Sequence, residues 1–211
     1  MALAIFCWYH LALSLLSVLG FVINPVSTNI DGILISDFVY GVITPKIISE
    51  VRKASRKYGF PIFADLQCSS QIGDISKFKG FDLLTPTERE ARIAVNDSKG
   101  GIEWIANQLI SITDSKNTLI KLGADGFIAY GNINENIRQN FPALSANPVD
   151  VSGAGDSLFA SMSLAISTGS GIMEASIIGS VVASLAVNQL GNVPVKYDSL
   201  SQRIKTIFNE A

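Results

Sequence analysis

After the first thirty residues, short apolar runs alternate with longer amphipathic stretches, and this alternation constrains the fold more than any other feature of the chain. Residues 32–36 form one apolar run, which ends at Asp37, and residues 61–64 form the next. Between them, apolar residues recur at helical spacing from Pro45 to a stop at Gly59. This order of strand, helix and strand is typical of a parallel sheet. We therefore predict an α/β fold in which helices flank a mostly parallel sheet.

The same order continues toward the end of the chain. The expected strands cover residues 81–85, 117–122 and 126–130, and the last of them turns into a hairpin loop, which predicts an antiparallel margin. The expected helices open near Thr87 and cover residues 101–112, 155–167, 172–188 and 200–208. The polar residues 65–79 are expected to cross the surface. No repeat or linker divides the chain, so we predict one domain from residue 31 to residue 211.

Residues 1–30 contain no Asp, Glu, Lys or Arg, and residues 11–23 are almost wholly apolar. Such a run is long enough for a membrane span or a secretory signal, but the basic flanks and cleavage site of those segments are missing. The alternatives are a buried strand or helix, or a start altered by truncation. His10 is expected to pack rather than to bind a metal, because no second ligand lies at useful spacing. We expect a cytoplasmic protein, and the sequence leaves the role of residues 1–30 open.

Charge and composition exclude several kinds of function. The formal net charge is only -2, and no run of Lys or Arg could follow a nucleic-acid backbone, so nucleic acid is not expected as a partner. One histidine and two widely spaced cysteines, Cys7 and Cys68, do not make a zinc site or a disulfide framework. Small molecules are the expected ligands.

A glycine-rich turn, Asp150-Val-Ser-Gly-Ala-Gly-Asp156, leads directly into an apolar helix pattern. Its glycines let a ligand approach the backbone, and the free N–H groups of the new helix attract anions. A carboxylate in the first turn, Asp156, could take a proton from an attacking hydroxyl there. The alternative is that both aspartates only cap and shape a turn. The turn is neither a P-loop nor a dinucleotide fingerprint, because the Lys-Ser or Lys-Thr pair and the third glycine are missing.

With these residues in place, the turn resembles the DTxGAGD signature of the PfkB carbohydrate kinases. Residues 85–91 (TPTEREA) are similar to the TPNxxE segment of that family, and residues 121–126 (KLGADG) resemble its xxLGxxG turn. Residues 36–41 (SDFVYG) look like the SDYxxG strand end of the RfaE-type heptose-phosphate kinases. The resemblance runs from about residue 31 to residue 208. It implies a three-layer ribokinase-like fold and ATP-dependent transfer of a phosphoryl group to a sugar hydroxyl.

The resemblance also implies roles for individual residues. Asp156 would be the catalytic base and would face the substrate, beside an anion hole made of Gly153, Ala154 and Gly155. Glu90 would organise Mg²⁺ through water, next to Thr87 at the phosphates.

Further positions would surround the nucleotide, the sugar and a cation. Lys121 and Gly123 would border the triphosphate or ribose, and the stretch from Asn188 to Gly191 would close the adenine pocket. Asp37 would face the sugar. Asp150 and Ser152 would hold a monovalent cation such as K⁺. The implied cofactors are ATP and Mg²⁺.

Several of these positions have an equally local explanation. Thr87 and Glu90 have the spacing of a capping box, which is compatible with the catalytic role, although Thr87 replaces the Asn of the family. Lys121 could be a solvated lysine at a strand end. Asp37 could simply end a strand and accept backbone hydrogen bonds.

The family resemblance implies a sugar-binding part before this region, with a glycine-pair motif and a lid sheet, and residues 1–30 do not resemble it. Because positioning supplies much of the rate of phosphoryl transfer, we expect poor catalysis without the lid. The leading hypothesis is a transferase of the carbohydrate kinase class that is closest to heptose-phosphate kinases. The alternatives are a non-catalytic nucleotide-binding or partner-binding fragment, completed by a second copy or a separate chain, and a membrane-tethered protein.

Overall fold

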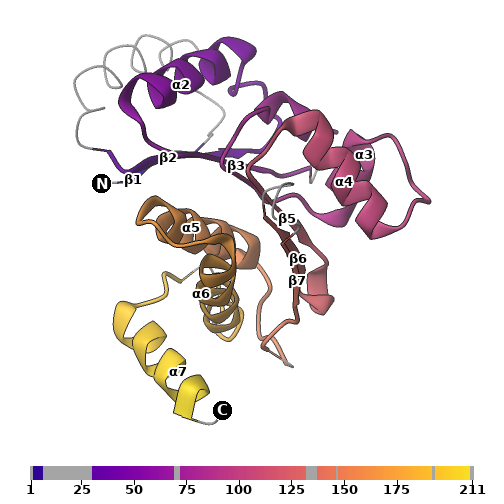
Figure 1. The fold of residues 1–211 in the computed structure, drawn as a ribbon. Helices are drawn as coiled ribbons and strands as arrows, with labels where there is room; N and C mark the ends of the chain where they lie inside the picture. The colour runs from indigo at the N-terminus through magenta and orange to yellow at the C-terminus, as the bar shows by residue number, and fades with distance from the viewer. Residues whose placement is uncertain are drawn as a thin grey trace.

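The computed structural model describes residues 2–6, 30–68, 72–131, 137–145, 147–191 and 193–209. Their strands form one seven-stranded sheet in the order β1-β2-β3-β4-β5-β6-β7 (Figure 1). Neighbouring strands are parallel from β1 to β5, whereas β6 and β7 are antiparallel. The predicted parallel sheet and its antiparallel margin are therefore confirmed. The strands are β1 (Ala2–Phe6), β2 (Gly32–Asp37), β3 (Ile62–Leu66), β4 (Leu83–Leu84), β5 (Asn117–Lys121), β6 (Phe127–Tyr130) and β7 (Arg138–Phe141).

Helices cover both faces of the sheet and make three layers with it (Figure 1). One face packs against α2 (Pro45–Tyr58), α3 (Glu88–Ala94) and α4 (Ile102–Thr113), and the other against α5 (Ala154–Ser167) and α6 (Ile172–Ala186). The last helix, α7 (Tyr197–Asn209), contacts α6. Each face has its own apolar cluster, because strands buried on both sides send alternate side chains to opposite faces. The α/β fold predicted from the sequence is confirmed.

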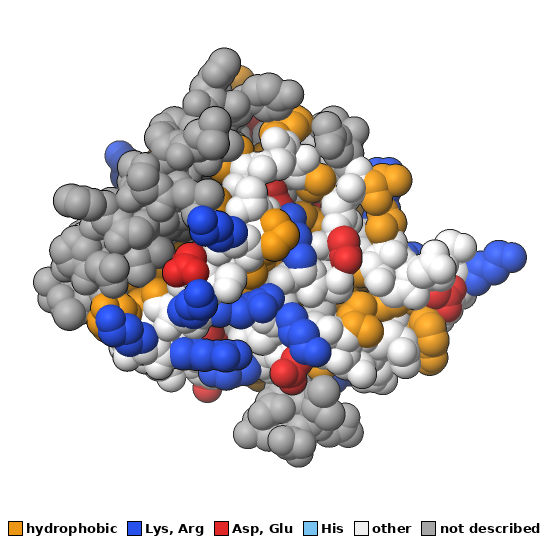
Figure 2. Space-filling model, turned by 90° about the horizontal axis from the view of Figure 1, so that it is seen from above, with side chains coloured by type: hydrophobic (Ala, Val, Ile, Leu, Met, Phe, Trp, Pro, Cys, Tyr) orange, Lys and Arg blue, Asp and Glu red, His pale blue; other side chains and the backbone are white. Residues whose placement is uncertain are grey.

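Local signals set the ends of α2. Thr44 caps the first turn by accepting a hydrogen bond from the Ile47 N–H, and Pro45 occupies the first helical position. The helix stops at Gly59, which has a left-handed φ of 78°. Its apolar face is buried, whereas Lys46, Lys53, Arg56 and Lys57 are exposed. Lys and Arg side chains gather on the face of the molecule that is seen from above (Figure 2). The helix predicted from Pro45 to Gly59 is confirmed.

The stretch 65–79 differs from the surface crossing that its polarity predicts. Asp65 still belongs to β3 and is completely buried. Further on, the 3₁₀ turn η2 (Ile75–Phe78) buries Ile75 and Phe78 in the core, where Phe78 packs edge-to-face on Phe81. Two apolar side chains among many polar ones are enough to fix this turn. The strand β7 was also not predicted, because its largely exposed residues show no apolar pattern.

Residues 2–6 of the N-terminal segment form β1, which pairs in parallel with β2, from Ala2 opposite Gly32 to Phe6 opposite Ser36. His10, Cys7 and the rest of the apolar run lie outside the described residues. Within the described parts of the chain, no helix combines the length and the apolarity that crossing a bilayer requires.

Candidate functional site

The site lies where the carboxyl ends of the parallel strands face the start of α5. Gly153 caps this helix with a left-handed φ of 75°, and no side chain caps its first turn. The Ala154 N–H donates to the Val151 carbonyl at 3.3 Å, and the amides that follow it in the first turn of α5 have no side-chain cap. The helix dipole favours an anion there. Gly153, Ala154 and Gly155 are half-buried. The turn thus has the backbone geometry of an anion-binding site.

Asp156 lies in the first turn of α5, beside these amides. Its Oδ1 accepts a hydrogen bond of 2.5 Å from Nε2 of Gln67, a residue that directly follows β3. The backbone N–H of Gln67 donates in turn to the carbonyl of Asp37, at 2.8 Å. The carboxylate is therefore oriented by a side chain that is itself fixed to the edge of the sheet.

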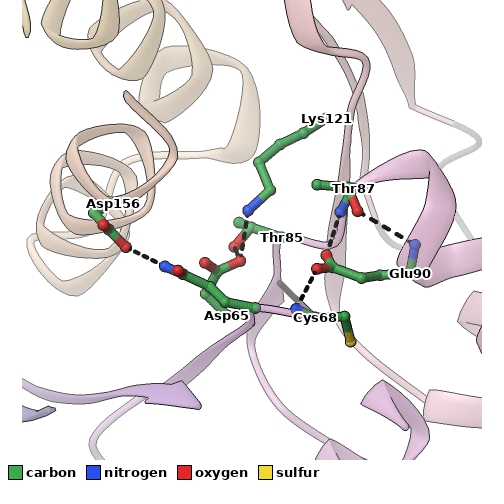
Figure 3. A network of polar contacts seen from close by, with 8 residues as sticks. Asp65, Cys68, Thr85, Thr87, Glu90, Lys121 and Asp156 are labelled. Carbon is green, nitrogen blue, oxygen red and sulfur yellow. Dashed lines mark hydrogen bonds and ion pairs between the residues drawn. The ribbon is translucent and has the colours of Figure 1, made fainter. Parts of the chain in front are cut away.

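A buried ion pair lies next to this carboxylate (Figure 3). Lys121, at the end of β5, donates from Nζ to Oδ1 of Asp65 at 2.8 Å, and Thr85 donates from Oγ1 to the same oxygen at 2.7 Å. Burial raises the pKa of Asp65, and Lys121 is the largest influence that opposes this shift. A Cβ added to Gly155 would lie 3.5 Å from Nζ of Lys121, so the ammonium group is close to the start of α5. The ion pair thus joins β3 to β5, and its ammonium group lies beside the start of α5.

Glu90 and Thr87 form the capping box expected at the start of α3. The Thr87 Oγ1 accepts from the Glu90 N–H at 3.3 Å, and the Thr87 N–H donates to Oε2 of Glu90 at 2.7 Å. The other oxygen, Oε1, accepts from the Cys68 N–H at 2.9 Å. Because both oxygens of this buried carboxylate hold backbone N–H groups, Glu90 can reach a metal only through its remaining lone pairs.

Asp37 lies at the end of β2 and is 1% exposed. Its Oδ1 accepts from the Val39 N–H at 2.9 Å, and its Oδ2 is paired with Lys77. These contacts are those of a residue that ends a strand, which is the local role that the sequence also permits.

Asp150 joins the glycine-rich turn to the segment after α6. Its Oδ1 accepts from the Ser152 N–H at 2.9 Å and its Oδ2 from the Gly191 N–H at 3.0 Å. These donors hold the pKa of the Asp150 carboxyl below its usual value, Ser152 having the largest effect. Nearby, Asn188 accepts a hydrogen bond on Oδ1 from Oγ of Ser145, at 2.9 Å. The structure therefore brings the proposed cation residues and the proposed adenine residues together.

Gly123 follows β5 directly and opens a 3₁₀ turn, η3 (Gly123–Asp125), with a left-handed φ of 64°. It therefore lies at the same edge of the sheet as Lys121. Sequence reasoning missed Asp65, Gln67 and Thr85, because only the order of the strands brings these residues to the site. The signal that could have found Asp65 is an acidic residue at the end of an apolar run, as at Asp37.

Comparison with known proteins gives consistent matches. The family model for pfkB family carbohydrate kinases matches residues 24–195. The bifunctional protein HldE of Citrifermentans bemidjiense is 30% identical over 173 residues, and that of Trichlorobacter lovleyi is 28% identical over 172 residues. Each of these matches covers 80% of this chain, which spans 34% of the length of either relative.

Solved structures show the same fold. Arabidopsis thaliana ribokinase, complexed with ribose and ATP, superposes with a TM-score of 0.71 and 23% identity, covering 86% of this chain and 58% of that one. Phosphofructokinase-2 from Escherichia coli, in complex with substrates and products, gives a TM-score of 0.73 and 16% identity, covering 92% and 62%. The fold is therefore ribokinase-like, and from the family match over residues 24–195 we conclude that the chain belongs to the pfkB family of carbohydrate kinases.

Proposed function

We propose that this chain transfers the γ-phosphoryl group of ATP to a hydroxyl of a sugar or sugar phosphate. The observation that carries the proposal is the start of α5, which has no side-chain cap and presents backbone amides and the carboxylate of Asp156 together at the carboxyl edge of the sheet. Membership of the family supports sugar kinase activity in general. The residues around the turn support a division of roles.

In the proposed reaction, Asp156 accepts the proton of the acceptor hydroxyl while the oxygen of that hydroxyl forms a bond to the γ-phosphorus. The bond between this phosphorus and the bridging oxygen breaks, and ADP leaves. The amides of the turn from Gly153 to Gly155 that do not already donate within the chain, as Ala154 does to Val151, stabilise the charge on the phosphoryl oxygens. Gln67 orients the Asp156 carboxylate through its 2.5 Å hydrogen bond. Such proton transfer and positioning are what phosphoryl transfer requires of a protein.

The nucleotide is proposed to lie between two segments that meet at the site. Lys121 and Gly123 would border its phosphates or ribose from β5. Asn188 and Gly191 would border the adenine from the other side, in a segment held by Asp150. This arrangement would place the γ-phosphate at the first turn of α5.

Two cations belong to the proposal. Mg²⁺ keeps several waters and takes phosphate oxygens, so it does not need a protein cage, and the described residues contain no group of three or more metal-binding side chains. Glu90 would hold it through water, because its two oxygens already accept backbone N–H groups. Mg²⁺ would neutralise phosphate charge when bound with ATP. A monovalent cation such as K⁺ would lie beside Asp150 and Ser152, where it would order the turn.

The acceptor is proposed to be a heptose phosphate or a related sugar phosphate, since the relatives that match at about 30% identity are bifunctional HldE proteins. Asp37 would face this sugar only if Lys77 or Val39 released its carboxylate. The alternative function is a nucleotide-binding or partner-binding module of the same fold. The chain spans about a third of the length of these relatives, and a second copy or another chain that completes the site is a further possibility.

The test is to measure ATP binding and Mg²⁺-dependent ADP release by the purified chain, with and without a panel of sugars and sugar phosphates. Asp156→Asn should lose sugar-dependent release by at least about a hundredfold while keeping its affinity for ATP. Asp198→Asn is a matched control, because Asp198 also lies in the first turn of a helix, α7, and is exposed there. Binding without release would favour the nucleotide-binding module. The absence of ATP binding would refute both the kinase and the nucleotide-binding module and would leave the partner-binding module.

A further inference from the structure

The ion pair between Asp65 and Lys121 leaves hydrogen-bonding groups unused in a buried place. The Asp65 side chain is fully buried and that of Lys121 is 15% exposed. Both donors to Asp65, Lys121 and Thr85, reach the same oxygen, and Oδ2 has no hydrogen-bond partner among the described residues. The ammonium group has three N–H donors, and Asp65 takes one of them. The pair is therefore only half satisfied.

Stability does not account for such an arrangement. A buried ion pair is often no more stabilising than apolar residues of the same size, and a network with unused groups is costly. Buried polar groups without partners therefore call for another explanation, such as a ligand. An anionic ligand cannot donate to Oδ2 of Asp65, but it can accept from the N–H groups of Lys121 that Asp65 does not take, and this contact would offset part of the cost of the pair.

The position of the pair indicates the kind of ligand. A Cβ on Gly155 would lie 3.5 Å from Nζ of Lys121, which places the ammonium group beside the first turn of α5. Figure 3 shows the Asp65 carboxylate between Lys121 and Asp156. Positive charge thus reaches the helix start from two directions, from the helix dipole and from Lys121. An anion with several oxygens, bound at this turn, would meet both.

We propose that Lys121 donates to an oxygen of the phosphoryl group bound at the turn 153–156, and that Asp65 positions Lys121 for this contact. The inference rests on the proposed function and adds a residue pair to it. Lys121 touches the ligand, whereas Asp65 acts through Lys121.

The first test measures binding of inorganic pyrophosphate by calorimetry at constant ionic strength, which requires neither sugar nor turnover. Lys121→Met keeps most of the side-chain volume and removes the charge, so the Kd should rise by about tenfold to a hundredfold, as expected for a lost charge-assisted hydrogen bond. The control is Lys116→Met, because Lys116 pairs with Asp82 just before the start of the same strand and is 71% exposed. This control should bind pyrophosphate as the unchanged chain does.

The second test separates positioning from folding. Asp65→Asn removes a negative charge near the anion, so the Kd for ATP should not rise, whereas kcat for sugar-dependent ADP release should fall about tenfold or more. A purely structural role would weaken binding and melting temperature as well. The double variant with Asp65→Asn and Lys121→Met removes both charges and shows whether loss of folding explains either result.

The outcomes distinguish this inference from the proposed function. If Lys121→Met binds pyrophosphate as tightly as the unchanged chain, or if neither protein binds it, the inference is wrong. If pyrophosphate binding depends on Lys121 but no sugar stimulates ADP release, the contact of Lys121 stands and the proposed function fails. If Asp65→Asn raises the Kd and leaves kcat unchanged, Asp65 is not a positioning residue.

Discussion

Replacing Gly155 with alanine should separate the stability of the fold from its function. A Cβ at this position would meet only Nζ and Cδ of Lys121, at 3.5 and 3.8 Å, which are ordinary van der Waals distances. Gly155 is the second residue of α5 and does not have a positive φ. Alanine loses less backbone freedom on folding than glycine, so the variant should gain up to about 1 kcal/mol in the free energy of unfolding. For a chain of this size, that gain corresponds to a rise of about 2–4 °C in melting temperature.

The same methyl group would occupy the space where a phosphoryl oxygen must approach the backbone amides. Loss of one preorganised donor of this kind costs about a hundredfold or more in kcat. The assay therefore combines thermal unfolding with calorimetric ADP binding and sugar-dependent ADP release. Gly101→Ala is the control for binding, because a Cβ on Gly101, the cap of α4, meets nothing within 4 Å. A Gly155→Ala variant that is stable and fully active would refute the anion site at α5.

Two further predictions concern the carboxylates around the site. Glu90→Gln leaves one acceptor oxygen for two backbone N–H groups, those of Cys68 and Thr87. The free energy of unfolding, measured in urea, should therefore fall by about 1–3 kcal/mol. An unchanged free energy would contradict the capping contacts. The pKa of Asp150 is lowered in the folded chain, so its contribution to stability is present above the usual value of 3.8 and is lost as the pH falls through the folded-state pKa. With Asp150→Asn, the melting temperature should therefore fall less steeply as the pH is lowered into the acid range. The Gly191 amide should also exchange its hydrogen faster, because it loses its carboxylate acceptor. An unchanged dependence of melting temperature on pH would show that the Asp150 carboxylate does not stabilise the fold.

Local signals made much of the fold predictable. The ends of α2 follow from Thr44, Pro45 and Gly59, and the start of α3 follows from the spacing of Thr87 and Glu90. Such caps depend on residues within one turn, so the sequence contains all the information they need. The order of apolar runs was likewise sufficient to predict a mostly parallel sheet with an antiparallel margin.

The site was less predictable because its contacts join distant parts of the chain. The residues of the glycine-rich turn were found from their local pattern. Asp65 and Lys121, in contrast, meet because β3 and β5 both pair with the short strand β4, which brings the ends of β3 and β5 close together. A one-sequence pattern does not contain that strand order. The edge strand β7 was missed for another reason: its exposed side chains show no apolar period, and its place depends on Phe141 stacking on Phe127 at a centroid distance of 5.1 Å.

The hydrogen bond between Gln67 and Asp156 has a consequence for the order in which the site assembles. The two residues are 89 positions apart in the chain, and Asp65 and Lys121 are 56 apart. During synthesis from the N-terminus, β3 therefore emerges long before its partners in α5 and waits with unpaired polar groups. These contacts of the site can form only after α5 has packed on the sheet, so ligand binding would report that β3, β5 and α5 have come together.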